Sequence, residues 1–389
     1  MKKALLICMD HYPNGDAGAV RTHVFAKMME SINYEPTIVG LGKTTNFAFE
    51  KYENFSYISL RSLDNDIYSK IKNRLFFHSR LKKYLLDDQN KWDAILFSGV
   101  PKQTINVLKK YSKKKRIPLI YDAVEWYSPE QFSIGKLHPA YIANNRLNTK
   151  YIDKSIMVVA ISSYLENHYS KKKIKTIRIP VVMDMDKISC KKETCSEKVV
   201  FLYAGSPGKK DYLDIIISGF SQANLCVPYE LKIIGITKGQ LVSQSGANLL
   251  EVEKLGEHLC CMGRVTRDEV LKQLSCADFT VLMRSEEQRY AKAGFPTKFV
   301  ESLATGTPVI SNATSDLAEY LEDGKNGFLV SECSSQALKE AIQKAIKISF
   351  DERKDMQMYA QQSANEKFNF KIHINLIKDL IENNKNEIL

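Results

Sequence analysis

AGFPTKFVESLATGTPVISN, residues Ala293–Asn312, places a Gly-Phe-Pro loop before a helix-like run, a Thr-Gly-Thr-Pro turn and a short apolar strand. Such units, bounded by Gly and Pro, are typical of α/β proteins. Gly294 and Pro296 leave bare backbone N–H groups at the start of the predicted helix, and such groups bind anions. Glu301 follows about two turns into that helix. The stretch therefore predicts a phosphate site beside a carboxylate that contacts hydroxyl groups.

Length and composition are those of a globular protein with two domains, because the chain has 389 residues, 44% hydrophobic and 26% charged. No apolar run approaches the ~20 residues that cross a bilayer, and the N-terminal apolar stretch is too short for a signal peptide. We therefore expect a cytoplasmic protein. The eight cysteines include no CxxC pair, so neither a zinc site nor a disulfide framework is indicated.

Short apolar strands alternate with amphipathic helical patterns along the chain, which predicts doubly wound parallel sheets. The first set of strands is KALLICM (3–9), EPTIVGL (35–41), AILFSGV (94–100), PLIYDAV (118–124) and IMVVAIS (156–162). The second set is KVVFLYAGS (198–206), YELKIIGI (229–236), HLCCMGRV (258–265), FTVLMRS (279–285), TPVISN (307–312) and GFLV (327–330).

A proline-containing extended stretch, IRIPVVMDMDKI (177–188), separates the two sets of strands. We therefore predict two Rossmann-like domains joined by one linker, at residues 1–182 and 183–371. The terminal segment, about 372–389, is predicted as a helix that returns to the first domain.

The loops that follow the strands are the candidate sites, because ligands in open α/β sheets bind beyond the carboxyl ends of the strands. DHYPNGDAGAVRTHVF carries Gly15 and Gly18 before a helix, a backbone surface suited to an oxygen-rich group. It lacks the spacing of a dinucleotide fingerprint. YDAVEWYSPEQF carries Asp122 and Glu125 beside two aromatic residues, a pattern that suits sugar recognition and equally suits a capping acid with core aromatics.

Two further loops belong to the predicted second domain and are expected to meet at one site. YAGSPGKKDYLDIII places Gly205 and Ser206 in a glycine-rich turn before Lys209 and Lys210, which supplies bare amides and point charges for a diphosphate. VLMRSEEQRYAKAG places Arg284 in a charged loop directly before the opening stretch.

Three segments in this order resemble the donor-binding domain of the retaining GT-B glycosyltransferases of family 4: GSPGKKD, GRVTRDEVLKQLSCADFTVLMRS and GFPTKFVESLATGTPVISNATSDLAEYLEDGKNGFLV. The resemblance implies two Rossmann-like domains that face each other across a cleft, a nucleotide-sugar donor and no cofactor. It implies that Glu301 binds the ribose hydroxyls and that Lys209 and Lys210 bind the phosphates.

The remaining donor-site residues that we predict are Gly18, Gly205, Ser206, Arg264, Arg284, Gly294, Phe295, Pro296, Thr297 and Lys298. The predicted catalytic residues are Asp122, Glu125 and Lys210.

The chain departs from the family pattern at two positions. Ala293 stands where the family commonly has a glutamate that contacts the donor sugar, so main-chain groups of Gly294 and Phe295, or Glu287, are expected to replace it. Val124 stands where the family often has a histidine. Both departures leave the identity of the transferred sugar open.

Positive charge is concentrated between Ile67 and Pro118, where 14 Lys or Arg stand against three acids. That excess of 11 equals the formal charge of the whole chain and indicates an anionic partner. No nucleic-acid-binding module is visible, which favours the inner face of a membrane. RLFFHSRLKKYLL (74–86) sets Leu75, Phe76, Leu81 and Leu85 at near-helical spacing, typical of a membrane-surface helix or of one packed on its own domain.

The predicted function is retaining sugar transfer from a nucleotide donor to a sugar or lipid-linked acceptor in bacterial surface polysaccharide or glycolipid assembly. No metal is expected, since no Asp-x-Asp motif directly follows a predicted strand. Two alternatives stay open: a nucleotide-sugar epimerase of the same architecture, and a non-catalytic basic binding protein.

Overall fold

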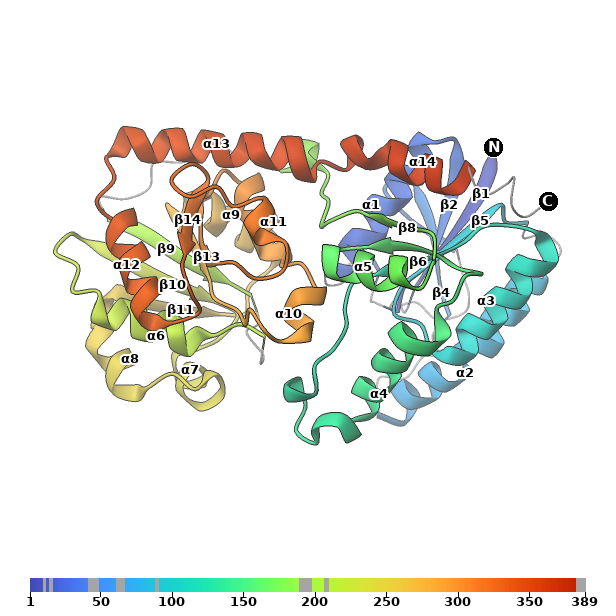
Figure 1. Cartoon of the computed structure of the whole chain (residues 1–389), viewed down its shortest axis with the longest axis horizontal. Helices are drawn as coiled ribbons and strands as arrows, with labels where there is room; N and C mark the ends of the chain where they lie inside the picture. Colours follow the sequence, from blue (N-terminus) through green and yellow to red (C-terminus); the bar gives the residue numbers. More distant parts are fainter. Residues whose placement is uncertain are drawn as a thin grey trace. The chain divides into compact units, whose positions relative to one another are not determined.

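The computed structural model describes residues 1–9, 12–13, 17–40, 49–60, 67–87, 91–188, 198–205 and 210–382, with the side chains of 67–75 excepted. The chain forms two compact units (Figure 1). Unit 1 comprises Met1–Met183 and Phe370–Leu389, and unit 2 comprises Asp184–Asn369. Each unit is a mainly parallel sheet covered by helices, which confirms the predicted α/β fold class.

The described residues of unit 1 form an eight-stranded sheet in the order β3-β4-β2-β1-β5-β6-β7-β8, with β3 and β4 antiparallel and the other pairs parallel. The strands are β1 (Lys2–Ile7), β2 (Tyr34–Gly40), β3 (Phe49–Tyr52), β4 (Phe55–Ser59), β5 (Ala94–Phe97), β6 (Leu119–Ala123), β7 (Met157–Ala160) and β8 (Thr176–Arg178). The five predicted strands are present. The sequence analysis missed β3 and β8 because these short strands stay partly exposed and carry no apolar run, and it also missed β4.

Helices cover both faces of this sheet. They are α1 (Ala17–Ser31), α2 (Ile67–Leu86), α3 (Lys102–Lys115), α4 (Pro139–Arg146), α5 (Ser163–Lys171) and α14 (Ile374–Glu382), with short η1 (Pro129–Gln131), η2 (Gly135–Leu137), η3 (Leu147–Tyr151) and η7 (Phe370–His373). The terminal helix α14 lies beside α1 (Figure 1), and its Ile377 and Leu380 share a core with Leu6 of β1 and Phe25 of α1.

Helix α2 packs on unit 1 through apolar side chains and turns its lysines outward. Leu81 and Leu85 are buried, whereas Lys82 and Lys83 are exposed and Phe76 is half-exposed. This arrangement favours the second of the two interpretations of the 74–86 pattern, a helix packed on its own domain. The side chain of Leu75 lies outside the described residues.

Unit 2 has a six-stranded parallel sheet in the order β11-β10-β9-β12-β13-β14. Its strands are β9 (Val199–Ala204), β10 (Tyr229–Ile234), β11 (Leu259–Gly263), β12 (Phe279–Leu282), β13 (Val309–Asn312) and β14 (Gly327–Val330). All six were predicted, because strands buried on both faces read as continuous apolar runs.

Unit 2 also carries helices on both faces of its sheet. They are α6 (Leu213–Gln222), α7 (Lys238–Ser245), α8 (Leu249–Leu255), α9 (Arg267–Cys276), α10 (Arg289–Ala293), α11 (Thr297–Ala304), α12 (Ser335–Ala345) and α13 (Phe350–Phe368), with short η4 (Met185–Lys187), η5 (Gly256–His258) and η6 (Leu317–Glu319). Phe201 and Tyr203 of β9 pack in one core with α6 and α12, and Val200 and Leu202 pack in a second core with α9.

The strand order of unit 2 reverses between β9 and β12. Successive strands run outward from β9 through β10 to β11, and from β12 through β13 to β14 on the other side. The loops that leave β9 and β12 therefore diverge at a topological switch point, the place where open α/β sheets bind ligands. Among the described residues, no helix is both long and apolar enough to cross a membrane.

Candidate functional site

Four side chains from three segments meet at the switch point of unit 2. Asp211 follows β9 and forms a backbone bridge to Arg284, which follows β12. The Tyr203 hydroxyl donates to Asp211 Oδ2 at 2.8 Å, and Lys298 Nζ of α11 bonds the same oxygen. Lys298 Nζ also donates to the Tyr203 hydroxyl at 2.7 Å, while Arg284 Nε lies 3.2 Å from Asp211 Oδ1. One carboxylate thus faces two cations.

The charges in this cluster shift each other's protonation. Burial alone would raise the pKa of Asp211, but Lys298 and Arg284 outweigh it and lower the pKa. Burial lowers the pKa of Lys298 and Arg284 adds to that effect, whereas Asp211 and Glu301 oppose it. With two cations and one carboxylate, the cluster keeps a net positive charge and attracts anions.

Arg284 is buried with unused hydrogen-bond donors. Its main chain is fixed by Asn312, whose Oδ1 accepts from Arg284 N at 3.1 Å and whose Nδ2 donates to Arg284 O at 2.8 Å. Its guanidinium lies 5.6 Å from the centre of the Tyr290 ring. Among the described residues, this guanidinium has the ion pair with Asp211 but no hydrogen bond. Buried polar groups are rarely left unsatisfied, so a ligand is expected to complete this site.

Gly205 allows Lys298 to approach the main chain at the end of β9. Its φ of +140° lies in the range that side chains rarely adopt, and its N–H donates to Ile234 O at 3.0 Å. A Cβ at Gly205 would come within 2.7 Å of Lys298 Nζ and closer still to Cε. A side chain at this position would require Lys298 to move from the conformation that it has here.

Helix α11 begins at Thr297, because Gly294, Phe295 and Pro296 are not helical. Pro296 at the N-cap provides no side-chain hydrogen bond, as the sequence predicted. Glu301 is the fifth residue of α11, so it lies little more than one turn inside the helix, not two. The reason is that the loop takes up three residues between α10 and α11.

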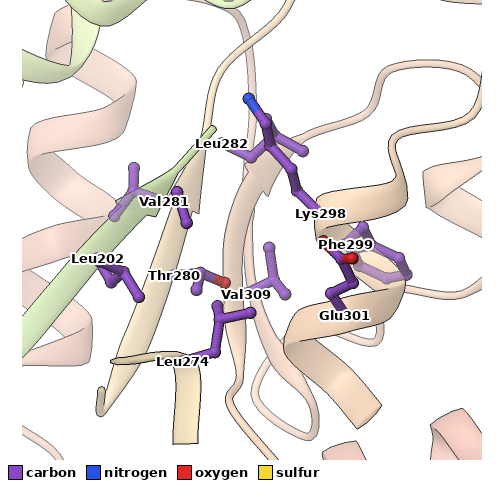
Figure 2. A pocket seen from close by; sticks show the side chains of 10 residues that line it. Leu202, Leu274, Thr280, Val281, Leu282, Lys298, Phe299, Glu301 and Val309 are labelled. Carbon is purple, nitrogen blue, oxygen red and sulfur yellow. The ribbon is translucent and has the colours of Figure 1, made fainter. Parts of the chain in front are cut away.

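Glu301 is held by Arg267 from the start of α9, with Arg267 Nη1 2.9 Å from Glu301 Oε1. Burial raises the pKa of Glu301, and Arg267 offsets part of that rise. Figure 2 shows Glu301 and Lys298 projecting from α11 toward the strands. Together with mostly apolar residues of β9, β12 and β13 they line a pocket of about 10 Å³, room for one water molecule.

The Gly-Phe-Pro loop offers less to a ligand than its sequence suggests. The Phe295 side chain is buried against Phe299, Tyr320 and Phe368 and so belongs to the core. Gly294 N–H already donates to Tyr290 O at 3.0 Å.

The other predicted donor residues differ in how they are held. Arg264 directly follows β11 and is exposed, and within the described part of the chain its side chain has no hydrogen bond or ion pair. The main-chain oxygen of Lys210 accepts from the Tyr290 hydroxyl at 2.8 Å. Ser206 and Lys209 lie outside the described residues.

Asp122 of unit 1 is the second-last residue of β6 and forms a buried, bidentate ion pair with Arg21 of α1. Arg21 Nε lies 2.9 Å from Asp122 Oδ2, and Nη2 donates to Oδ1 at 2.9 Å. The other guanidinium donors bind the carbonyls of Pro180 at 2.6 Å and Ile179 at 3.0 Å. Burial raises the pKa of Asp122 and Arg21 offsets it only in part. These contacts favour a positioning role, while the predicted catalytic role stays a prediction.

Glu125 and Gly18 contribute main-chain carbonyls to the contacts of unit 1. Glu125 O accepts from the side-chain amides of Asn144 and Asn148, each at 3.3 Å. Gly18 lies in the first turn of α1, where its carbonyl accepts from the Thr22 hydroxyl at 2.9 Å. The roles predicted for Glu125 and Gly18 also stay predictions.

The sequence analysis did not identify Asp211, Tyr203, Arg267 or Arg21 as site residues. Asp211 directly follows the Lys209–Lys210 pair, and Arg267 lies in the quoted segment GRVTRDEV, so both stood beside recognised signals. Their partners are far away in the chain, and only the fold brings them together.

Comparisons with known proteins place unit 2 in a family. The family model for Glycosyl transferases group 1 matches residues 184–363. Among curated proteins, the uncharacterized glycosyltransferase MJ1069 of Methanocaldococcus jannaschii is 22% identical, covering 98% of this chain and 99% of that protein. The putative colanic acid biosynthesis glycosyltransferase WcaL of Salmonella typhimurium is 27% identical, over 37% of this chain and 34% of its own length.

A solved structure shows the same fold over both units. Anabaena Alr3699/HepE in complex with UDP-glucose superposes with a TM-score of 0.66 at 16% identity, and the match covers 98% of this chain and 100% of that chain. Unit 2 therefore matches the glycosyl transferases of group 1 over nearly all of its length, and these likenesses support a transferase enzyme with the two-domain GT-B fold.

Proposed function

We propose that the protein moves a sugar from a nucleotide diphosphate sugar to an acceptor hydroxyl, with retained anomeric configuration and without a metal ion. The observation that carries the proposal is the cationic cluster at the switch point of unit 2. Lys298 and buried Arg284 lie there on either side of Asp211, close to Gly205, and the Arg284 guanidinium makes no hydrogen bond within the described residues. A similar protein, HepE, was solved with UDP-glucose.

The reaction breaks the bond between the anomeric carbon and the diphosphate oxygen, and forms a bond from that carbon to the acceptor oxygen. The acceptor hydroxyl loses its proton, and negative charge develops on the departing diphosphate. Fixed cations and N–H dipoles aimed at that charge lower the barrier. We assign this task to Lys298, Arg284, Arg264 and Lys210, with the start of α11.

Glu301 is assigned to the ribose hydroxyls of the donor. One oxygen of its carboxylate contacts the Arg267 guanidinium, and the remaining lone pairs of the carboxylate can accept hydrogen bonds from hydroxyl groups. The cations around the diphosphate supply charge stabilisation that a divalent metal supplies in other transferases. A metal is therefore not required by this arrangement.

We place the acceptor against unit 1, near the loop that holds Glu125 and Trp126. Trp126 is buried, with Nε1 bonded to Asn145 Oδ1 at 3.0 Å, so the loop has a fixed shape. Assembly of a surface polysaccharide or glycolipid fits the name of WcaL. A lipid-linked acceptor would bring the enzyme to the inner face of the membrane, where exposed lysines of α2 and α3 meet anionic lipid.

The deciding experiment incubates the protein with a panel of nucleotide sugars, with and without membrane lipid extract. Nucleotide release that depends on the acceptor, with a product of retained configuration by NMR, supports the proposal. Conversion of the sugar without acceptor would indicate an epimerase instead. A protein that binds lipid and leaves every nucleotide sugar intact would indicate the non-catalytic alternative.

A further inference from the structure

Asp211 is the member of the switch-point cluster with no assigned role. Its carboxylate receives the Tyr203 hydroxyl and the Lys298 ammonium on one oxygen, and lies 3.2 Å from Arg284 Nε at the other. The side chain of Asp211 is 7% exposed, whereas that of Lys298 is 26% exposed. The Asp211 side chain is therefore more deeply buried than that of Lys298.

We infer that Asp211 is a positioning residue of the donor site, holding Lys298 and Arg284 so that their remaining donors bind the donor diphosphate. The inference rests on the proposed function and adds a residue to it. An ammonium has three donors, and Asp211 and Tyr203 take two of those of Lys298. Within the described residues the third donor of the ammonium has no partner, so an entering anion can bind it without displacing the carboxylate.

The main chain supports the same arrangement. The backbone bridge between Asp211 and Arg284, and the hydrogen bond of 2.9 Å from Tyr212 N to Met283 O, join the loops that follow β9 and β12. Gly205 leaves the space that Lys298 fills. Asp211 thus holds Lys298 of α11 and Arg284 in fixed positions relative to the loops that follow β9 and β12.

The opposite role for Asp211 makes a different prediction. If Asp211 competed with the ligand for the two cations, its neutralisation would strengthen anion binding. If it positions them, neutralisation loosens Lys298 and weakens binding. It also removes the carboxylate that helps Lys298 keep its proton, since Asp211 and Glu301 raise the pKa of Lys298 against burial and Arg284. Burial raises the pKa of the neighbouring Tyr203 and Tyr290, so both phenols stay neutral.

The test measures pyrophosphate binding to the full chain by calorimetry from neutral to alkaline pH. Pyrophosphate has no base or sugar, so the result does not depend on which nucleotide the enzyme uses. We expect wild-type affinity to fall at high pH as Lys298 loses its proton. Asp211→Asn should bind pyrophosphate about tenfold more weakly at neutral pH. Its alkaline fall in affinity should also begin at a lower pH than that of wild type.

Two variants complete the test. Lys298→Arg should bind pyrophosphate with a smaller alkaline fall than wild type, because arginine keeps its proton. Asp278→Asn is the matched control, since Asp278 bonds Arg353 and Val200 N at the amino end of β12, and it should behave as wild type. Unchanged or tighter binding by Asp211→Asn, or an alkaline fall that does not move, would overturn the inference.

Melting curves of each variant show whether it folds. If Asp211→Asn does not fold, Lys298→Arg carries the test, and an alkaline fall as large as that of wild type in this variant overturns the inference. The transfer assay separates the two proposals. If the wild-type protein transfers sugar and Asp211→Asn binds pyrophosphate as wild type does, only the positioning role is refuted. If Asp211→Asn binds pyrophosphate more weakly but the wild-type protein transfers no sugar, only the proposed function is refuted.

Discussion

The two units each bury an aspartate beside an arginine at the carboxyl end of a strand, but they balance the charge differently. In unit 1 the Arg21 guanidinium gives its donors to Asp122 and to two carbonyls. In unit 2 Asp211 is shared by Lys298 and Arg284, and the Arg284 guanidinium makes no hydrogen bond within the described chain. In unit 1 one arginine balances one aspartate, and we call this the closed pair. In unit 2 two cations share one aspartate, which leaves positive charge for a ligand, and we call this the open cluster.

The pKa shifts express the same contrast. One cation does not overcome the burial of Asp122, so its pKa is raised, whereas two cations overcome the burial of Asp211 and lower its pKa. Both carboxylates are buried, and Asp211 has more partners that lower its pKa than Asp122 has. A buried ion pair by itself is therefore no sign of a ligand site. An excess of cations over carboxylates is a better one.

The positive charge that unit 1 exposes lies on its helices, and removing it should have the largest effect. Replacing Lys82, Lys83, Lys113, Lys114 and Lys115 with Gln should abolish binding to anionic vesicles, since each basic group near such a surface contributes about 1 kcal/mol. Vesicle sedimentation at rising salt measures this, and wild-type binding should fade as salt screens the charges.

The matched control changes the same number of exposed lysines in unit 2, at Lys238, Lys254, Lys272, Lys344 and Lys354. It should leave vesicle binding close to wild type. Wild-type protein that ignores anionic vesicles at low salt would refute the membrane proposal. Binding that persists at high salt would point to exposed Phe76, since Leu85 is buried.

Opening the closed pair of unit 1 should destabilise the fold strongly. Arg21→Met leaves Asp122 as a buried charge without its partner and should lower the free energy of unfolding by about 3–5 kcal/mol at pH 7. Because burial raises the pKa of Asp122, the loss should shrink as pH falls and the carboxyl is protonated in the folded state. Urea unfolding at several pH values measures both effects.

Arg178→Met is the comparison for that variant, because Arg178 pairs with Glu166 where both side chains are about one-third exposed. It should cost less than about 1 kcal/mol. A loss for Arg21→Met no larger than this would mean that the closed pair contributes little to the stability of unit 1.

Crowding the open cluster of unit 2 should weaken donor binding. In Gly205→Ala the new Cβ meets Lys298, so the lysine must move, and we expect about tenfold weaker binding of UDP with a stability loss of about 1–3 kcal/mol. Calorimetry and melting curves measure the two changes. Gly324→Ala also has positive φ but open space around the Cβ, so it should share the strain and keep UDP affinity.

Arg264 has no side-chain hydrogen bond or ion pair among the residues that the structure describes, so replacing it should affect the ligand and leave the fold unchanged. Arg264→Gln should weaken UDP binding by about 1.5 kcal/mol, the low end for a charged hydrogen bond, with an unchanged melting temperature. Lys354→Gln, an exposed lysine on α13, is the control. Equal UDP affinities in the two variants would remove Arg264 from the donor site.

The smallest effect concerns metal removal. If the cations of unit 2 supply the charge stabilisation, sugar transfer should proceed at the same rate in EDTA and in added Mg²⁺ or Mn²⁺. Release of nucleotide from the donor measures the rate. Activity lost in EDTA and restored by a divalent ion would show that the cluster does not replace a metal.

Much of the fold follows from local sequence patterns. The six strands of unit 2 are buried on both faces and appear in the sequence as apolar runs, and helix α11 ends at the predicted Thr-Gly-Thr-Pro turn. The missed strands β3 and β8 lie at the two edges of the unit 1 sheet, whereas the missed strand β4 lies between β3 and β2 and is mostly buried. Edge strands are partly exposed, so burial does not impose the pattern by which a strand is recognised.

The sequence by itself determined the class of fold, the glycine directly after β9, the uncapped start of α11, and the presence of Arg284 after β12 and of Lys298 and Glu301 in α11. These features depend on neighbouring residues. Only the tertiary structure decided that Asp211 joins Lys298 to Arg284, that Arg267 holds Glu301 and that Arg21 closes over Asp122. The residues of these pairs are 34 to 101 positions apart in the chain. Coulomb and hydrogen-bond energies depend on the distance between two groups in space, and the order of residues in the chain does not determine that distance.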